Sequence, residues 1–231
     1  GAGGGLGRAM ADALQQAGAS VAVVGRGDSI MGLAGDGFIP LQGDLTQVGA
    51  PDRLVAEARA NLGGLDILVA AHGVARRSAA EDFPDEDWNA TVGTNLTSVF
   101  QTARAAGRMF LEQGSGKVIN VASMLSFSGG LMACAYAASK GGIAQLTKAL
   151  ANEWAGRGIN VNAIAPGYFA TSMTEALRKD KARNQQILDR LPAGRWGGPA
   201  DLAGAVIFLA SAASDYVHGI ILPVDGGWLA R

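Results

Sequence analysis

A tyrosine and a lysine one helical turn apart form the most reactive pair in the sequence. They occur in the segment Tyr136-Ala137-Ala138-Ser139-Lys140, and positions i and i+4 share one face of a helix. A free tyrosine has a pKa of about 10 and is a poor base at neutral pH. A cation close to the phenol stabilises the phenolate, which suits the side chain to general acid/base chemistry. Taken alone, the pair is more simply explained by a core tyrosine beside a solvated lysine.

The second chemical signal is a glycine-rich turn, Gly1-Ala2-Gly3-Gly4-Gly5-Leu6-Gly7. It runs directly into a helical pattern that we expect over Leu6–Ala17. Backbone N–H groups of such a turn can approach a pyrophosphate closely, and the helix dipole favours its negative charge. The spacing of Gly1, Gly5 and Gly7 differs from the G-x-G-x-x-G dinucleotide pattern. A frayed N-terminus explains the same residues equally well.

The elements that must position these residues alternate between short β-branched runs and longer amphipathic segments. This pattern predicts an α/β fold with a doubly wound, Rossmann-like parallel sheet, helices on both faces and three layers. The predicted strands are Ser20–Val24, Phe38–Leu41, Leu65–Ala70, Lys117–Val121, Asn160–Ile164 and Ile220–Val224. The predicted helices are Leu6–Ala17, Pro51–Asn61, Asp85–Gly107 continuing to Glu112, Ala135–Arg157 and Asp201–Ala210.

The length of 231 residues favours a single domain over residues 1–231. The chain starts inside the glycine-rich turn, so we expect the first strand of the sheet to be missing upstream of Gly1. The polar stretch Tyr168–Gly198 has no strand pattern, and we interpret it as a lid or substrate loop with short helical pieces.

Composition excludes several classes of function. The net charge of −1 gives no support for a nucleic-acid partner. No apolar run approaches the roughly 20 residues that a membrane span needs, so we expect no membrane association. The single cysteine, Cys134, cannot form an intrachain disulfide and favours a reducing, cytoplasmic location. We expect no metal site.

Other residues of the sequence strengthen the interpretation of the tyrosine–lysine pair as catalytic. Ser123 follows the strand Lys117–Val121, and Asn95 lies in an earlier helical segment. Together with the glycine turn, and with Pro166-Gly167 followed by Thr171, this set resembles the short-chain dehydrogenase/reductase family over essentially the whole chain. The resemblance implies an NAD(P)-dependent oxidoreductase that interconverts a secondary alcohol and a ketone on a small-molecule substrate.

The resemblance also implies roles for individual residues. Tyr136 would be the general acid/base, Ser123 would stabilise the substrate oxygen, and Lys140 would bind the nicotinamide ribose and lower the tyrosine pKa. Asn95 would hold a water that links Lys140 to solvent. Asp44 would contact the adenine, and Thr171 would bind the carboxamide. The implied cofactor-binding set is Gly1, Gly3, Gly5, Leu6, Gly7, Arg26, Asp44, Leu45, Gly73, Tyr136, Lys140, Pro166, Gly167 and Thr171.

The chain departs from the family pattern in two places. Ala70-Ala71-His72-Gly73 stands where the family has N-N-A-G, and we favour a packed, non-catalytic role for His72 over a compensating one. The connection between Arg26 and Asp44 is short and leaves little room for the usual helix.

Several local stretches, among them Pro192-Ala193-Gly194-Arg195 and the C-terminal Asp225-Gly226-Gly227-Trp228, resemble the family branch that acts on deoxy-sugar acids. A carboxylate substrate calls for an arginine or lysine. Arg76 and Arg77 lie where substrates bind in open α/β sheets, although a solvated loop pair is nearly as good an explanation. Met124 and Tyr168 complete the predicted substrate contacts. The alternatives are another short-chain reductase, such as a 3-oxoacyl carrier-protein reductase, or a non-catalytic NAD(P)-binding protein.

The cofactor preference is left open by the sequence. The second strand ends in Val24-Gly25-Arg26, with glycine where NAD-specific relatives carry an acid. Arg26 suits a 2′-phosphate, Gly25 leaves room for it, and Asp28 is an alternative ribose ligand. We therefore expect both NAD and NADP to bind. Family resemblance further implies a homotetramer built on the helices within 85–112 and 135–157 and on the sheet edge near 220–224.

Overall fold

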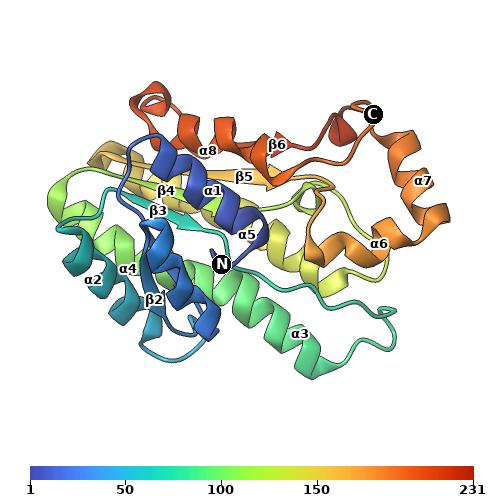
Figure 1. The fold of residues 1–231 in the computed structure, drawn as a ribbon, viewed down its shortest axis with the longest axis horizontal. Coiled ribbons are helices and arrows are strands. Elements are labelled where there is room, and N and C mark those ends of the chain that lie inside the picture. The colour runs from blue at the N-terminus through green and yellow to red at the C-terminus, as the bar shows by residue number, and fades with distance from the viewer.

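The structure, a computed structural model, describes residues 1–231 and contains six strands flanked by helices (Figure 1). All strand pairs are parallel. The six predicted strands are confirmed, with ends that move by one or two residues. The strands are β1 (Ala22–Gly25), β2 (Ile39–Gln42), β3 (Ile67–Ala70), β4 (Gly116–Val121), β5 (Ile159–Pro166) and β6 (Ile221–Val224).

The predicted helices are confirmed, but one of them is interrupted. The expected helix from Asp85 to Glu112 consists of α3 (Asp85–Val92), a π-helical turn (Gly93–Thr97) and α4 (Ser98–Gln113). Periodicity could not reveal this turn, because one extra residue per turn barely disturbs the apolar spacing. The other helices are α1 (Gly5–Gln16), α2 (Ala50–Leu62), α5 (Cys134–Trp154), α6 (Glu175–Lys179), α7 (Lys181–Arg190) and α8 (Ala203–Ala210).

Two connections bear on the predictions. The short segment between Arg26 and Asp44 does contain a helix, a 3-10 helix over Asp28–Asp36, so the space suffices for this tighter form. The predicted lid carries the short helices α6 and α7. None of the helices combines the length and apolar content that a membrane crossing needs.

The helices form one layer on each face of the sheet. On one face, α2, α4 and α5 pack against β4 and β5 around the buried Phe110, Val118 and Ile159. On the other face, α1 and α8 cover Ile119 and Ile164. Because successive side chains of a strand point to opposite faces, Val118 and Ile119 belong to different cores. Both strands are thus buried on both sides, as their near-continuous apolar sequence predicts.

The strands divide into two sheets instead of one. β1 pairs with β2, and the order in the other sheet is β3-β4-β5-β6. A largely apolar slot of about 570 Å³ lies between β1 and β3. The first residue lies at one end of this slot: the Gly1 amine donates to the Val24 carbonyl at 2.9 Å, and a Cβ on Gly1 would lie 2.6 Å from the Ala71 carbonyl carbon. The chain therefore enters between the carboxyl ends of β1 and β3.

Candidate active site

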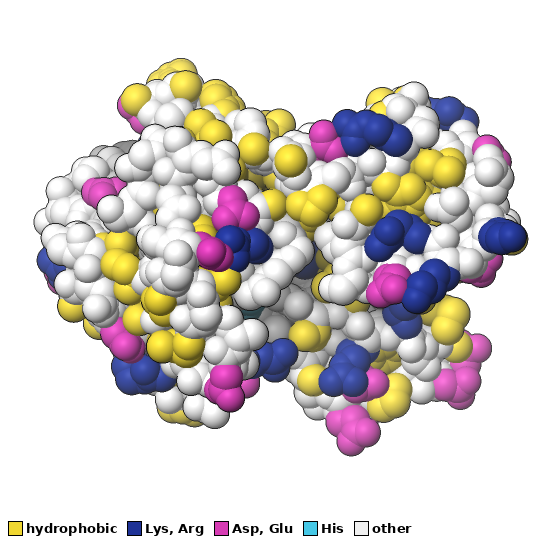
Figure 2. Space-filling model, in the orientation of Figure 1, with side chains coloured by type: hydrophobic (Ala, Val, Ile, Leu, Met, Phe, Trp, Pro, Cys, Tyr) yellow, Lys and Arg dark blue, Asp and Glu magenta, His cyan; other side chains and the backbone are white.

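A pocket of about 880 Å³ opens at the carboxyl ends of the strands. Its wall includes Gly25 at the end of β1, Gly43 after β2, Gly73 after β3, Ser123 after β4 and Pro166 at the end of β5. In open α/β sheets this edge is where ligands bind. Figure 2 shows the hollow between the body of the molecule and the lobe of α6 and α7, with Lys and Arg side chains around it.

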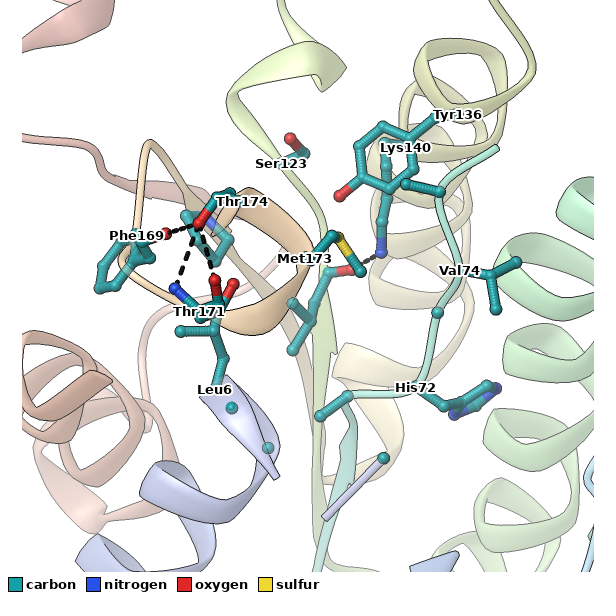
Figure 3. A pocket seen from close by; sticks show the side chains of 18 of the residues that line it. Leu6, His72, Val74, Ser123, Tyr136, Lys140, Phe169, Thr171, Met173 and Thr174 are labelled. Atoms are coloured by element: carbon teal, nitrogen blue, oxygen red, sulfur yellow. Dashed lines mark hydrogen bonds between the residues drawn. The ribbon is translucent and has the colours of Figure 1, made fainter. Parts of the chain in front are cut away.

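The predicted reactive side chains meet on one wall of this pocket. Tyr136 and Lys140 come from the first turns of α5, and Ser123 caps the short turn that follows β4. The Ser123 Oγ accepts a hydrogen bond from the Leu125 amide at 3.1 Å, so its own proton can be donated to Tyr136 or to a ligand. Figure 3 shows the Tyr136 hydroxyl on the same side of the pocket as Ser123, with the Lys140 amine below the ring.

Lys140 is buried with a single hydrogen-bond partner. It is 3% exposed, and its Nζ donates to the Val121 carbonyl at 2.6 Å while lying 5.8 Å from the Tyr136 ring centroid. Burial lowers the pKa of Lys140 to about 8. The amine therefore keeps its positive charge at neutral pH, close enough to favour a phenolate.

Burial raises the pKa of Tyr136, while a hydrogen bond with Ser123 and the charge of Arg77 act in the opposite direction. The Tyr136 side chain is therefore a phenol at neutral pH. A proton donor is thus present, and added positive charge would be needed to turn it into a base.

Asn95 is the one predicted catalytic residue that does not line the pocket. It is fully buried behind the wall, in the π-helical turn. Its amide brackets the Val74 backbone: Oδ1 accepts from Val74 N at 2.8 Å, and Nδ2 donates to Val74 O at 2.9 Å. The same Nδ2 lies 3.1 Å from Ser139 Oγ, whose proton is donated to the Tyr136 carbonyl. Asn95 thus ties the segment that follows β3 to the helix that carries Tyr136.

The glycine turn forms the opposite side of the pocket. A Cβ added to Gly3 or Gly4 would meet nothing within 4 Å, and Gly5 has a φ of +57° that disfavours other residues. A Cβ on Gly7 would collide with the Gly1 carbonyl. α1 begins here with no acidic residue in its first turn and no side-chain cap, so its first N–H groups face the pocket unpaired.

The residues after β1 and β2 meet at one end of the pocket. Arg26 Nη1 lies 4.0 Å from Asp44 Oδ2, and hydrogen bonds from Thr46 lower the pKa of Asp44. Asp28 accepts from Gln42 Nε2 at 2.7 Å, which engages the predicted alternative ribose ligand. The expected room at Gly25 is partly filled, since a Cβ there would lie 3.0 Å from Ile30 Cδ1.

His72 borders the pocket, and its ring extends toward α4 (Figure 3). Its Nε2 lies 2.8 Å from Ser98 Oγ, and Ser98 donates its own proton to the Thr94 carbonyl at 2.7 Å. The imidazole must therefore be the Nε2–H tautomer. Burial lowers the pKa of His72 to about 3. This geometry agrees with a packed, neutral histidine that ties β3 to the helical layer.

The substrate end of the pocket is cationic. Arg76 and Arg77 both line it, as do Met124 and Tyr168. Arg76 Nη1 lies 3.5 Å from Asp87 Oδ1, whereas Arg77 has no such partner. Sequence reasoning missed the two arginines of α7 that also line the pocket, Arg183 and Arg190. The lid prediction covered both residues, but no spacing rule marked the face of α7 that turns inward.

Comparison with known proteins places the chain in a family. Residues 1–229 match the family model described as enoyl-(acyl carrier protein) reductase. The chain is 48% identical over 233 residues to 2-dehydro-3-deoxy-D-gluconate 5-dehydrogenase of Escherichia coli K12, and 47% identical over 233 residues to the Dickeya dadantii protein of the same name. Each alignment covers 98% of this chain and 92% of the relative.

A solved structure agrees with the sequence matches. The gluconate 5-dehydrogenase of Burkholderia cenocepacia, in complex with NADP and tartrate, superposes with a TM-score of 0.95 at 38% identity, and the match covers 100% of this chain and 93% of that one. The chain therefore belongs to the short-chain dehydrogenase/reductase family and is an NAD(P)-dependent oxidoreductase that acts on CH–OH groups.

Proposed function

We propose that the chain interconverts a secondary alcohol and a ketone on a deoxy-sugar acid, with 2-dehydro-3-deoxy-D-gluconate as its substrate. The observation that carries the proposal is a pocket in which Ser123, Tyr136 and Lys140 share one wall, and whose lining also contains Arg76, Arg77, Arg183 and Arg190. The names of the relatives in Escherichia coli and Dickeya dadantii support this substrate. The tartrate in the Burkholderia cenocepacia complex supports a hydroxy acid more generally.

The residues present fit a nicotinamide dinucleotide. The side-chain-free surface of Gly3 and Gly4, and the unpaired N–H groups at the start of α1, suit a pyrophosphate. Leu6, Leu45, Gly73 and Gly167 also line the cavity, and Thr171 lies at the lid end. When bound, the nicotinamide gives or takes the hydride.

The chain itself handles the proton. In reduction, Tyr136 donates its phenolic proton to the substrate oxygen while the carbon gains the hydride. In oxidation, the phenolate takes the proton from the alcohol. Ser123 donates a hydrogen bond to the same oxygen and stabilises developing negative charge. A hydrogen bond with Ser123 and the charge of Arg77 lower the pKa of Tyr136 against the effect of burial. The positive charge of Lys140, and that of a bound oxidised nicotinamide, would favour the phenolate further.

Asn95 acts in this scheme as a positioning residue, because Val74 and Ser139 already occupy its side-chain amide. A group beside Gly73 would contact both Asn95 and Lys140: a Cβ there lies 3.2 Å from Asn95 Oδ1 and 3.8 Å from Lys140 Nζ. We place the proton path from Lys140 toward solvent at this point.

Both NAD and NADP should serve as cofactor. No acidic residue faces the 2′ position, because Gly25 replaces it and Asp28 is held by Gln42. Arg26 is free enough to accept a 2′-phosphate, since its side chain is 64% exposed and only loosely paired with Asp44. The NADP in the Burkholderia cenocepacia complex supports this choice.

We propose a homotetramer for the assembly. Phe100 on α4 is 37% exposed and Ile220 beside β6 is 42% exposed, so apolar surface is available on both predicted contact faces. Gly141 on α5 has open space where a Cβ would project, which permits a close helix–helix approach.

The slot between the sheets leads to a structural proposal. We propose that residues 1–231 work as one domain whose sheet is completed by a further parallel strand between β1 and β3, continuing into Gly1. The apolar lining of the slot and the hydrogen bond from Gly1 to Val24 support it. Such a strand would pair the facing backbone edges of β1 and β3.

The test of the proposed function is a substrate panel. Purified protein is incubated with 2-dehydro-3-deoxy-D-gluconate, 2-deoxy-D-gluconate, D-gluconate and a 3-oxoacyl thioester, each with both cofactors. We expect kcat/KM to be at least about tenfold higher for a deoxy-sugar acid than for the thioester, which corresponds to about 1.4 kcal/mol of transition-state binding. A preference for the thioester would contradict the proposal.

A further inference from the structure

The pocket carries far more positive charge than the protein as a whole. Its lining contains one acidic residue, Asp44, in a chain whose net charge is −1. The cationic residues of the lining are Arg26, Arg76, Arg77, Lys140, Arg183 and Arg190. Asp44 lies beside Arg26, so no acidic residue lines the pocket around Tyr136 and the lid. A concave surface of this kind attracts an anionic ligand.

Most of these cations already have a contact that accounts for them. Arg76 pairs with Asp87, and Lys140 donates to Val121. Arg183 donates to Gln186 Oε1 at 3.1 Å. The charge of Arg77 acts on Tyr136, so this guanidinium lies toward the reacting end of the pocket.

Arg190 is held in a different way. Its guanidinium carbon lies 4.1 Å from the centroid of the Trp228 ring, and it forms no ion pair or side-chain hydrogen bond. Trp228 is 8% exposed, and its ring packs edge-on against Tyr168 with centroids 4.7 Å apart. An arginine on an aromatic face keeps its position through the stack, while the N–H groups at its edge stay free.

The Trp228 ring, on which Arg190 stacks, is held in place by hydrogen bonds and apolar contacts. The Asp225 carboxylate accepts hydrogen bonds from the amides on either side of Trp228, Gly227 at 2.9 Å and Leu229 at 3.0 Å. Trp228 also packs in one apolar cluster with Met124 and Ile187. This cluster joins the residue after Ser123 to α7. The Trp228 ring on which Arg190 stacks is therefore held in place relative to the catalytic wall.

We propose that Arg190, stacked on Trp228, binds the substrate carboxylate and thereby selects acids over neutral sugars. This inference rests on the proposed function and identifies the side chain that recognises the substrate carboxylate. In 2-dehydro-3-deoxy-D-gluconate the carboxylate is at the opposite end of the carbon chain from C5. Arg77, near Tyr136, faces the reacting end, and Arg190 provides the cation on the lid side.

The kinetic test compares Arg190→Ala with Lys181→Ala, which removes the same charge from an exposed residue of α7 outside the pocket. The substrates are 2-dehydro-3-deoxy-D-gluconate and its neutral carboxamide, with NADPH saturating. We expect Arg190→Ala to lower kcat/KM for the acid by about 30-fold, mainly through KM, as for the loss of a charge-assisted hydrogen bond. The carboxamide should change by less than about threefold. Arg190→Lys should recover only part of the loss, since lysine lacks the planar, bidentate edge.

Equal losses for the acid and the carboxamide, or an Arg190→Ala effect no larger than that of Lys181→Ala, would overturn the assignment. A second experiment, which measures binding alone, distinguishes failure of this inference from failure of the proposed function. Calorimetric titration of NADPH-saturated protein with D-gluconate, with D-glucitol as the neutral control, forms a dead-end complex, because an alcohol cannot accept the hydride, and so involves no turnover. Loss of D-gluconate binding in Arg190→Ala, with melting temperature unchanged, supports the assignment even if 2-dehydro-3-deoxy-D-gluconate is not turned over. Retained D-gluconate affinity in that variant refutes it.

Discussion

Arg26 offers a sharp test of how the pocket distinguishes NADP from NAD. Arg26→Ala removes the pocket-lining guanidinium that follows β1, while the glycine turn and the catalytic wall stay intact. Arg26 is 64% exposed and lies 4.0 Å from Asp44, so its backbone and core contacts are not at stake.

The size of the effect follows from this exposure. A charge-assisted hydrogen bond contributes about 1.5–3 kcal/mol, and a solvent-exposed pair falls at the lower end of such a range. We therefore expect NADP to lose about 1.5–2 kcal/mol, or roughly 10- to 30-fold in kcat/KM, where about 1.4 kcal/mol is tenfold. NAD lacks the 2′-phosphate that the Arg26 guanidinium would bind, so it should change by less than about threefold.

The assay is kcat/KM for each cofactor at a fixed, saturating sugar acid, in the parent and in the variant. Arg53→Ala removes an exposed arginine outside the pocket that pairs with Glu57, and is the matched control. Equal losses for NAD and NADP in Arg26→Ala would mean that the arginine contacts a part of the cofactor that both share, such as the adenine. It would then not recognise the 2′-phosphate.

The remaining predictions concern stability and assembly. Because the folded protein holds the pKa of His72 at about 3 and an unfolded chain binds that proton near about 6.5, stability should fall as pH drops through this window, by up to about 1.4 kcal/mol per pH unit. In His72→Gln the acid side of the melting profile should be flatter, and identical pH slopes would refute the neutral assignment. Light scattering at micromolar concentration should give a tetramer, and a monomer mass would refute the assembly. Extending the chain before Gly1 with an apolar, β-branched segment should raise the melting temperature by at least about 5 °C relative to a Gly/Ser extension of equal length; no rise would refute the strand proposal.

The order of strands and helices was predictable because parallel strands buried on both faces are almost continuously apolar, as in β5 (Ile159–Pro166). The glycine turn, Ser123, Tyr136 and Lys140 were predictable as a group because a family resemblance fixes their order. The resemblance could not place Asn95 behind the wall, since its partners Val74 and Ser139 lie 21 and 44 residues away in sequence.

The substrate end was less predictable for a physical reason. Two adjacent arginines after β3 look equivalent in sequence, yet only Arg76 meets Asp87. The stack of Arg190 on Trp228 joins α7 to the last residues of the chain, a contact that only tertiary packing creates. The π-helical turn at Gly93–Thr97 likewise left no trace in the apolar spacing.

The most direct measurement of the central claim is single-turnover reduction of 2-dehydro-3-deoxy-D-gluconate by Tyr136→Phe, followed by NADPH absorbance. The substitution keeps the ring in its place beside Lys140 and removes only the hydroxyl that can deliver a proton. We predict that the rate falls by about 10² to 10⁴ while the Kd of NADPH stays within about threefold of the parent value. A variant that keeps a tenth of the parent rate would contradict the role assigned to Tyr136 and the mechanism built on it.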